Sequence, residues 1–271
     1  MFCDTWQGSG SYGRAVPVLE KPVSPEAQAA ELHFILASVD RRRILSELQK
    51  EELHVNEVAK RLEMTATETL RQFQRMSEAG LLQKIPDGKY RVTPYAKLIL
   101  DISSPLDFIS ENREYFQDHD VLLLPPEFRA RLGELSGCKL IPTTIDTINA
   151  VTEMFLDAQE RIDTVTMGTE SIIKIEEQRS REGVKVRWLM HESLKPKAPS
   201  ILRSWQKPPE IRWTPTVIGH IVVTDKAALL TIRGNDGRMT YESFVGHDAV
   251  FMKWAGELFN HEWEKAKPWY P

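Results

Sequence analysis

The sequence predicts a two-domain protein of the α+β and α/β classes, in which a small helical domain ending in a β-hairpin precedes an α/β domain with a mixed sheet. Three observations support this fold class. The chain has 271 residues, more than one domain usually contains. Short helical patterns between residues 25 and 79 lead into a hairpin pattern. Helical and strand patterns alternate after residue 141.

These patterns divide the chain into four segments. We assign residues 1–24 to a flexible arm, 25–100 to the helical domain with its hairpin, 101–140 to a helical connector and 141–271 to the α/β domain. In the arm, Gly8, Gly10 and Gly13 match the spacing G-x-G-x-x-G of a dinucleotide-binding loop. Such a loop needs a strand before it and a helix after it, and the sequence offers neither, so we expect no cofactor there.

Three helices are expected before residue 65. Pro25 suits a first helical turn, and a helical pattern follows over residues 26–38. Asp40 is expected to cap the second helix and Asn56 the third, because short polar side chains accept hydrogen bonds from the first backbone N–H groups of a helix.

A fourth helix is expected to begin at Thr65. The run Thr65-Ala66-Thr67-Glu68 fits a capping box, in which the threonine and glutamate side chains each accept a backbone hydrogen bond. The glycine after Ala79 is expected to end this helix in a left-handed conformation.

At 100° per residue, the two faces of this helix differ in character. Its apolar positions, expected to face the core, are Thr69, Leu70, Phe73 and Met76. Arg71 and Arg75 lie opposite Phe73, with Gln72 and Gln74 on the flanks. Arginine and glutamine side chains pair with base edges, and cationic side chains contact phosphates. The candidate DNA-contacting residues, on this helix and on the hairpin around Pro86-Asp87-Gly88, are Thr65, Thr67, Arg71, Gln72, Arg75, Lys84, Lys89 and Arg91.

The segment LEMTATETLRQFQRMSEAGLLQKIPDGKYRVTPYAKLIL resembles the ArsR-like and related winged-helix repressors of bacteria and archaea. The resemblance is clearest in the Ala-Gly-Leu-Leu ending of the helix, the Gly-Lys-Tyr hairpin and the following Thr-Pro. It implies a winged helix-turn-helix over residues 25–100. In that fold the last helix enters the major groove of double-stranded DNA, and the hairpin, or wing, reaches the backbone or minor groove.

The net charge of the chain limits how it could bind DNA. The whole chain has a net charge of −4, and residues 26–95 contain eleven Lys or Arg and eleven Asp or Glu. No overall field therefore attracts nucleic acid, and binding must come from a local basic patch. A homodimer would double that patch, and residues 26–38 and the connector are the candidates for the dimer contact.

The connector carries the runs NREYF at residues 112–116, HD at 119–120 and RLGEL at 131–135. This pattern resembles the middle region of the archaeal methanogenesis-regulatory-protein family, where it stands between a winged helix and a sensing domain. The resemblance implies that residues 141–271 form an effector-sensing domain for a small molecule whose identity the sequence does not give.

In the α/β domain, helices are expected over residues 145–162, 170–181 and 248–265, and strands over residues 164–167, 184–190, 210–213, 218–224, 227–233 and 238–243. The aromatic stripe of the last helix, which includes Phe251 and Trp254, is expected to be core. The pattern Arg-Glu-Gly-Val-x-Val-Arg at residues 181–187, followed by a strand with Asp225 just before the run AALL at 227–230, resembles phospholipase-D-like half domains. Such half domains also serve as non-catalytic sensors in archaeal TrmB-type regulators. Catalysis in that family needs the motif H-x-K-x4-D, and His220 is not followed by the lysine. The resemblance therefore implies no catalytic residues.

Small ligands usually bind at strand ends in open α/β sheets. The candidate effector-binding residues are Thr169 and Glu170 after one strand, His191 after the next, and His220 with Asp225 nearby. These residues can also be present for reasons other than ligand binding. Thr169 can cap its helix, and both histidines can be structural or simply exposed.

Composition and short motifs argue against several other classes of protein. Hydrophobic residues make up 41% and charged residues 27%, as in ordinary globular proteins. No apolar run approaches the ~20 residues that span a bilayer, and no secretory signal is visible, so we expect a cytoplasmic protein. Cys3 and Cys138 are too few for a disulfide scaffold and lack metal-ligand spacing, although a redox switch stays open. Neither His191-Glu192 nor His261-Glu262 continues to H-E-x-x-H, so we expect no metal site.

Two other function classes stay open beside a DNA-binding transcriptional regulator, which we favour. Small-molecule O-methyltransferases also begin with a winged-helix-like domain with similar Ala-Gly-Leu and Thr-Pro patterns. Such an enzyme needs a glycine-rich loop for S-adenosylmethionine, and the glycines beyond residue 140 stand singly, so we expect no enzyme. The second class is a protein-binding adaptor whose winged helix has lost DNA contact, which the balanced charge of residues 26–95 suggests.

Overall fold

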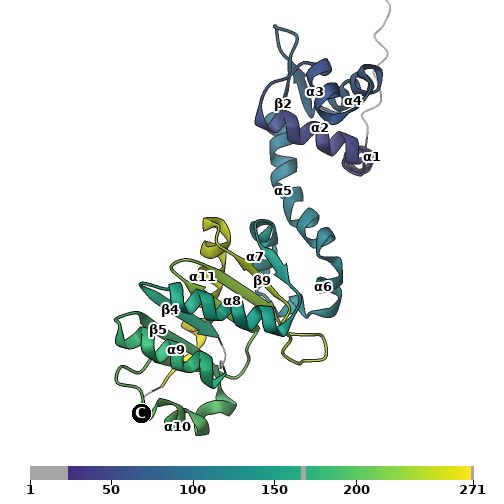
Figure 1. The fold of residues 1–271 in the computed structure, drawn as a ribbon. Helices are drawn as coiled ribbons and strands as arrows, with labels where there is room; N and C mark the ends of the chain where they lie inside the picture. Colours follow the sequence, from purple (N-terminus) through teal and green to yellow (C-terminus); the bar gives the residue numbers. More distant parts are fainter. Residues whose placement is uncertain (1–23, 166–168, 270–271) are drawn as a thin grey trace, which may run out of the picture. The chain divides into compact units, whose positions relative to one another are not determined.

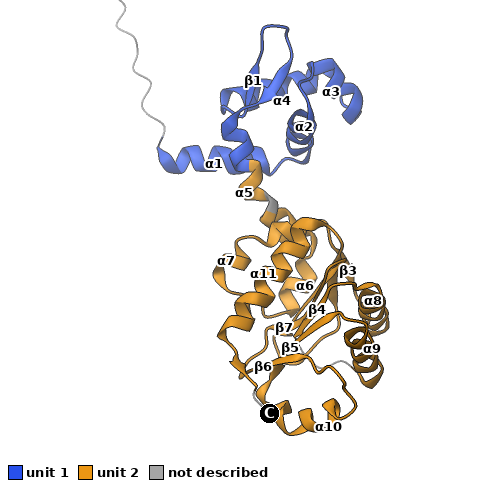
Figure 2. Ribbon diagram, turned by 90° about the vertical axis from the view of Figure 1, so that its left-hand side faces the viewer, with its two compact units in different colours: residues 1–99 blue, residues 100–271 orange. Residues whose placement is uncertain are grey.

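The computed structural model describes residues 24–165 and 169–269 (Figure 1). The chain divides into two compact units, unit 1 with residues 1–99 and unit 2 with residues 100–271 (Figure 2). The expected arm, its glycine pattern at residues 8–13 and Cys3 lie outside the described residues. Each unit is described by itself below.

Unit 1 consists of a set of short helices and a hairpin. Its helices are α1 (Pro25–Leu36), α2 (Val39–Lys50), α3 (Val55–Leu62) and α4 (Ala66–Glu78). Ile44, Phe73 and Met76 are fully buried in its core, as the spacing of apolar residues predicts. Leu70 was expected in this core but is 43% exposed, because it lines an open hollow beside Lys84 and Tyr90.

The predicted hairpin is present. Strand β1 (Leu82–Lys84) pairs antiparallel with β2 (Tyr90–Val92), and Gly88 in the turn has φ +87°. Gly80 follows α4 with φ +73°, which confirms the predicted left-handed end of that helix. These two glycines set the direction in which the chain leaves α4 and the tip of the hairpin.

Two of the helix starts were predicted wrongly. The Ser38 hydroxyl, and not Asp40, accepts the backbone N–H of Arg41 at the start of α2 (3.5 Å). Position 54, and not Asn56, precedes the first turn of α3, where the Glu57 carboxylate accepts the His54 N–H (2.7 Å). Each helix therefore begins earlier than predicted, because several polar residues in a row can serve as caps.

Helix α5 (Pro94–Glu111) begins at Pro94, as Thr93-Pro94 predicts, but continues past the predicted end at Leu100 and across the boundary between the units. Pro105 lies inside it. A proline removes one backbone N–H and disfavours a helix interior, so the sequence pattern predicts an interruption here that the structure does not contain.

Within its described residues, unit 2 is built on an eight-stranded mixed sheet with the order β10-β6-β5-β4-β7-β8-β9-β3. The strands are β3 (Lys139–Ile141), β4 (Arg161–Val165), β5 (Lys185–His191), β6 (Glu210–Thr214), β7 (Gly219–Thr224), β8 (Ala228–Ile232), β9 (Ser243–Gly246) and β10 (Lys267–Pro268). Strands β4, β5 and β6 run parallel, and the other neighbouring strands are antiparallel. The predicted α/β domain with a mixed sheet is confirmed.

Helices cover both faces of this sheet (Figure 1). Helices α8 (Thr144–Asp157), α9 (Glu170–Arg181) and α10 (Ala198–Leu202) contribute to the core on one face, and α11 (Ala249–Lys265) to the core on the other. The 3₁₀ segment η3 (Glu192–Lys197) leads from β5 into α10. Phe251 and Trp254 of α11 are fully buried, which confirms the predicted aromatic core stripe.

Residues 101–140 belong to unit 2 and are not a separate connector. They contain α6 (Arg113–Asp118), η1 (Val121–Leu123), α7 (Pro126–Arg129), η2 (Leu132–Leu135) and β3. Tyr115, Phe128 and Leu135 are buried in the same core as α11. The Tyr115 hydroxyl accepts the backbone N–H of Ile232 on β8 (2.8 Å), so this segment is bonded to the sheet as well as packed on it.

Two further boundaries in unit 2 were predicted wrongly. The helix expected over residues 145–162 ends at Asp157, and Arg161 already belongs to β4. The Asp225 carboxylate accepts the backbone N–H groups of Gln159 and Glu160 (2.9 and 3.1 Å), which fixes the turn between α8 and β4. The strand expected over residues 238–243 begins only at Ser243.

Cys138 is a free, half-buried thiol. Burial, and next the negative charge of Asp248, raise the pKa of the Cys138 thiol to about 12. A thiol with a raised pKa is mostly protonated near neutral pH and therefore a poor nucleophile. Of the helices in the described part of the chain, none is both long enough and apolar enough to cross a membrane.

Candidate functional site

Helix α4 presents an exposed arginine face. The Thr65 hydroxyl accepts the Glu68 N–H at its start (3.2 Å), as predicted for an N-cap. The Arg71 side chain is 73% exposed, and Arg75 and Thr67 are also exposed. The guanidinium of Arg75 lies 5.4 Å from the ring centroid of Phe34. Both arginines therefore stand at the surface of unit 1, with their cationic groups accessible to a polyanion.

Gln72 does not share this exposed face, contrary to the prediction. Its side chain is only 7% exposed, and its Oε1 accepts a hydrogen bond from Arg41 of α2 (3.2 Å). Its Nε2 donates to Glu68. Gln72 therefore joins α4 to α2, and we remove it from the residues that can read base edges.

Arg41 is the buried centre of this contact. It is 5% exposed, and its guanidinium also donates to the backbone carbonyls of Ile35 (2.9 Å) and Phe34 (2.6 Å). Burial, followed by the nearby charges of Arg75 and Arg71, lowers the pKa of Arg41. This part of α2 and α4 therefore carries three arginines, Arg41, Arg71 and Arg75, whose charges Glu68 offsets in part.

Glu68 has a different role from the predicted capping box. Its carboxylate accepts hydrogen bonds from Arg71 (2.9 Å) and from Gln72, and these bonds lower the pKa of Glu68. Arg71 is therefore held in a surface ion pair with Glu68. Such exposed pairs are weak, so a phosphate can compete for this guanidinium.

The wing places three more cations at the surface of unit 1. Lys84 and Arg91 are exposed, and Lys89 is half-buried. Arg91 donates to the Gln83 side chain across the hairpin (3.1 Å) and lies 3.9 Å from Glu52, whereas Lys84 lies 6.0 Å from the Tyr90 ring centroid. The predicted basic residues thus occupy α4 and the hairpin, the two elements that contact DNA in winged helices.

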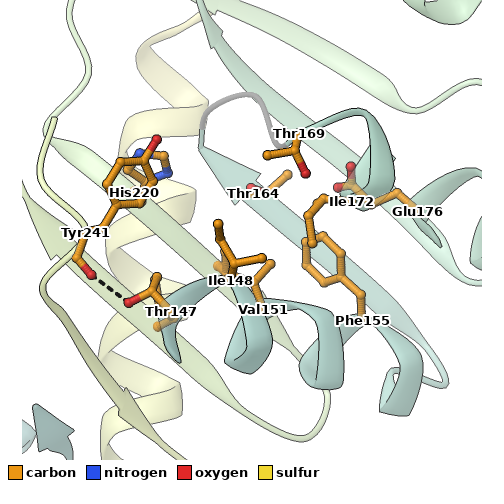
Figure 3. A pocket seen from close by; sticks show the side chains of 12 residues that line it. Thr147, Ile148, Val151, Phe155, Thr164, Thr169, Ile172, Glu176, His220 and Tyr241 are labelled. Atoms are coloured by element: carbon orange, nitrogen blue, oxygen red, sulfur yellow. Dashed lines mark hydrogen bonds between the residues drawn. The ribbon is translucent and has the colours of Figure 1, made fainter. Parts of the chain in front are cut away.

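Unit 2 contains a small cavity of about 80 Å³ that opens to solvent, between α8, α9 and one face of the sheet (Figure 3). Its lining residues come from two helices, three strands and the segments just before α9 and β9. They are Thr147, Ile148, Val151, Phe155, Thr164, Thr169, Ile172, Glu176, His220, Val222, Leu229 and Tyr241. Half of these residues are apolar, and several polar groups converge among them, a combination that occurs in small-molecule sites.

Two of the predicted effector-binding residues lie in this cavity, Thr169 and His220. Strand direction explains why they meet. The carboxyl end of β4 and the amino end of β7 lie at the same edge of the sheet, because these two strands are antiparallel neighbours. Thr169 lies in the segment after β4, and His220 is the second residue of β7, so both side chains reach the same end of these strands.

The other three predicted effector-binding residues do not line the cavity. Asp225 follows β7 at the opposite edge, about 16 Å along the strand from His220, where it fixes the turn before β4. Glu170 is exposed and pairs with Lys174 (2.8 Å). His191 bonds to Ser193 (2.7 Å) and to the carbonyl of Pro215 (2.8 Å), so it has the structural role. The structural alternative for Thr169 was that its side chain caps α9. The Thr169 side chain makes no such cap hydrogen bond.

The sequence did not single out Glu176, Thr147 and Tyr241, which also line the cavity. Glu176 is 2% exposed, and Trp188 Nε1 donates to its Oε1 (3.0 Å). Its position four residues after Ile172 puts it on the buried face of α9, and that spacing is the signal that could have identified it.

The two most buried titratable groups of the cavity are both uncharged near neutral pH. Burial raises the pKa of Glu176 to about 8, and the Trp188 hydrogen bond opposes this only in part. Burial lowers the pKa of His220 to about 4. At pH 7 the cavity therefore offers a protonated carboxyl group and a neutral imidazole as hydrogen-bonding groups.

We expect Glu176→Gln to change how stability depends on pH. The folded state keeps the Glu176 proton up to pH 8, whereas the unfolded chain loses it near pH 4.3, so the free energy of unfolding falls as pH rises between these values. The low pKa of His220 has the opposite effect, but only below about pH 6.5. From pH 6.5 to 8, the free energy of unfolding, measured by urea titration, should therefore fall by ~1–2 kcal/mol more for the unmodified protein than for the variant. Equal losses for both proteins would contradict the raised pKa.

A family comparison identifies part of unit 1. Residues 38–84 match the model of the bacterial regulatory protein arsR family. This segment is an arsR-type helix-turn-helix. It runs from the cap of α2 to the end of β1 and so includes Arg41, Thr65 and the arginine face of α4. The arsR-type helix-turn-helix supports a DNA-binding regulator.

No curated protein matches the chain. Among solved structures, TrmBL2, an archaeal chromatin protein, is 18% identical over 89% of this chain and 100% of its own, with a TM-score of 0.40. NucT from Helicobacter pylori is 15% identical over 49% of this chain and 97% of its own, with a TM-score of 0.38. An O-methyltransferase family protein from Burkholderia thailandensis is 15% identical over 70% of this chain and 61% of its own, with a TM-score of 0.25. At TM-scores below 0.5, these likenesses carry no functional conclusion.

Proposed function

We propose that this protein is a transcriptional regulator that binds specific sites in double-stranded DNA as a homodimer and responds to a small effector bound in the cavity of unit 2. The observation that carries the proposal is the exposed Arg71 and Arg75 face of α4 within an arsR-type helix-turn-helix. The proposal includes a cytoplasmic location and no enzymatic activity, and it retains the resemblance to the methanogenesis-regulatory-protein family.

The local charge is sufficient for such binding even though the net charge of the chain is −4. Five cationic residues, Arg71, Arg75, Lys84, Lys89 and Arg91, lie on α4 and the wing. Each phosphate that a protein neutralises adds about −0.9 to the slope of log affinity against log salt concentration. A dimer that uses half or more of these residues should therefore give a slope of about −4 or steeper.

Selection of duplexes from a randomised library tests the proposal without knowledge of the operator. The full chain should enrich a motif with two related half-sites and bind it with the steep salt dependence given above. Failure to enrich any sequence, together with no salt-dependent retention of DNA, would favour the adaptor alternative instead.

An apolar stripe on α5 supports the homodimer. Ile102 and Leu106, on the part of α5 that belongs to unit 2, are 62% and 66% exposed. They are four residues apart, so they lie on one side of the helix, as the seam residues of a coiled coil do. Phe34, also 57% exposed, is a further apolar candidate on α1, the other element that the sequence nominated for the contact.

Replacement of Ile102 by aspartate should convert the dimer to monomers, because a charge on this apolar face cannot be buried against a second copy. Light scattering after size-exclusion chromatography at micromolar concentration gives the mass directly. Lys97→Glu, a change at another exposed position of the same helix, should leave the dimer intact. A dimeric Ile102→Asp protein would rule out α5 as the contact.

A further inference from the structure

The cavity of unit 2 has two polar ends and an apolar middle (Figure 3). At one end, Thr147 Oγ1 donates to the Tyr241 carbonyl (2.6 Å), and the rings of Tyr241 and His220 lie 5.7 Å apart. At the other end, Glu176 extends from α9 and accepts the Trp188 hydrogen bond. The wall between them consists of the α8 side chains Ile148, Val151 and Phe155, with Ile172 of α9. The shape fits a compact molecule with an apolar body.

The charge of the lining excludes anions. Among the described residues that line the cavity there is no Lys or Arg, and the titratable ones are Glu176, His220 and Tyr241. His220 stays neutral at pH 7 because burial lowers its pKa to about 4. A carboxylate or phosphate that entered would lose its hydration without gaining a positive partner, which is strongly unfavourable.

Glu176 instead favours the binding of a cation in the cavity. In the part of the chain that the structure describes, its carboxyl group has a hydrogen bond from Trp188 and no ion pair. The neighbouring acid, Glu177, is already paired with Arg181 and accepts a hydrogen bond from Ser204. Glu176 is thus a buried acid at the wall of a cavity, and no positive charge in the described lining balances it. A cation placed against it would restore its ionised form.

We propose that the cavity binds a small organic ammonium ion, with its positive head group against the Glu176 carboxylate and its apolar body along Phe155 and Val151. The role of this ion as the effector rests on the proposed function, but its binding does not require DNA. Glu176 is protonated before binding, so the ion pair forms when the carboxyl proton leaves for the buffer. Each binding event near neutral pH therefore releases up to one proton.

Three probes with the same aromatic body test the proposal: benzylammonium, benzyl alcohol and benzoate. Each is titrated into the full chain at pH 7 by calorimetry in two buffers that differ in ionisation enthalpy. Benzylammonium should bind about tenfold or more tightly than benzyl alcohol, which corresponds to ~1.4 kcal/mol, and should release protons. Benzoate should not bind. Binding of benzoate as tight as that of benzylammonium, or no binding of benzylammonium, would overturn the proposal.

Glu176→Gln keeps the shape and the Trp188 acceptor but cannot ionise. It should reduce benzylammonium affinity about tenfold or more, end proton release and leave benzyl alcohol binding unchanged. Glu170→Gln, an exposed change on the same helix, is the matched control and should alter none of these quantities. Unchanged benzylammonium binding by Glu176→Gln would contradict the ion pair. If this variant does not fold, the three probes and the proton release of the unmodified protein decide the question.

DNA affinity, measured with and without benzylammonium, separates this inference from the proposed function. Failure of benzylammonium to bind while the selected duplex still binds overturns only the ammonium site. Binding of benzylammonium with no change in DNA affinity overturns only its role as an effector, because coupling between two sites must appear as a change in affinity at each.

Discussion

Replacing Arg71 and Arg75 together by alanine is expected to weaken binding to the selected duplex by at least about 30-fold, because each such arginine contact contributes ~1–3 kcal/mol. Both side chains are exposed on α4, within the arsR-type segment. Neither substitution removes a buried group, so the fold should be unaffected. Fluorescence anisotropy with a labelled duplex at constant salt concentration measures the change, and circular dichroism checks the fold.

The matched control removes the same charge elsewhere. Lys253→Ala with Lys265→Ala takes two cations from α11, where both side chains are largely exposed, at 73% and 59%. This pair should change the affinity less than twofold if position matters more than net charge. Equal losses for the two double variants would mean that overall charge, and not the α4 face, governs binding.

Replacing Arg41 by methionine is expected to lower the free energy of unfolding of unit 1 by about 3 kcal/mol. The substitution removes the Arg41 donor from three acceptors, namely the carbonyls of Phe34 and Ile35 and the Gln72 side chain. Of these, the Ile35 carbonyl keeps the backbone N–H of Ser38 (3.3 Å). Buried acceptors that lose a charged donor carry the full cost of their lost hydration. Urea titration of the full chain, followed by circular dichroism, measures the effect.

Arg43→Met provides the control for this loss. Arg43 lies on the same helix, its side chain is 49% exposed, and its ion pair with Asp40 is long (3.9 Å). Exposed pairs of this kind contribute little, so the expected change is below about 0.5 kcal/mol. If Arg41→Met were as mild as Arg43→Met, the buried hydrogen bonds of Arg41 would not be what joins α2 to α4.

Local patterns predicted unit 1 well because its contacts are close in sequence. The Thr65 cap and the buried Phe73 and Met76 follow from helix periodicity and capping preferences. The error at Gln72 has a non-local cause. A helical wheel gives the direction of a side chain but not what packs there, and Arg41, 31 residues earlier, covers that position.

The cavity of unit 2 was predicted only in part, because strand direction is not written in any one segment. His220 and Asp225 are close in sequence and were therefore expected to act together. They lie at opposite ends of β7, however, and are far apart in space. Because β7 pairs antiparallel with β4, His220 near the start of β7 lies at the end of the sheet where Thr169 also lies. Glu176 was overlooked because an acid on an amphipathic helix is usually exposed.

The central claim is that the arginine face of α4 lies against duplex DNA, and cross-linking tests it most directly. A photoreactive side chain in place of Gln74, an exposed residue beside Arg75 on α4, should capture the labelled selected duplex on irradiation. The same group in place of Lys253 on α11 should capture none. Capture from position 253 but not from position 74 would contradict the claim.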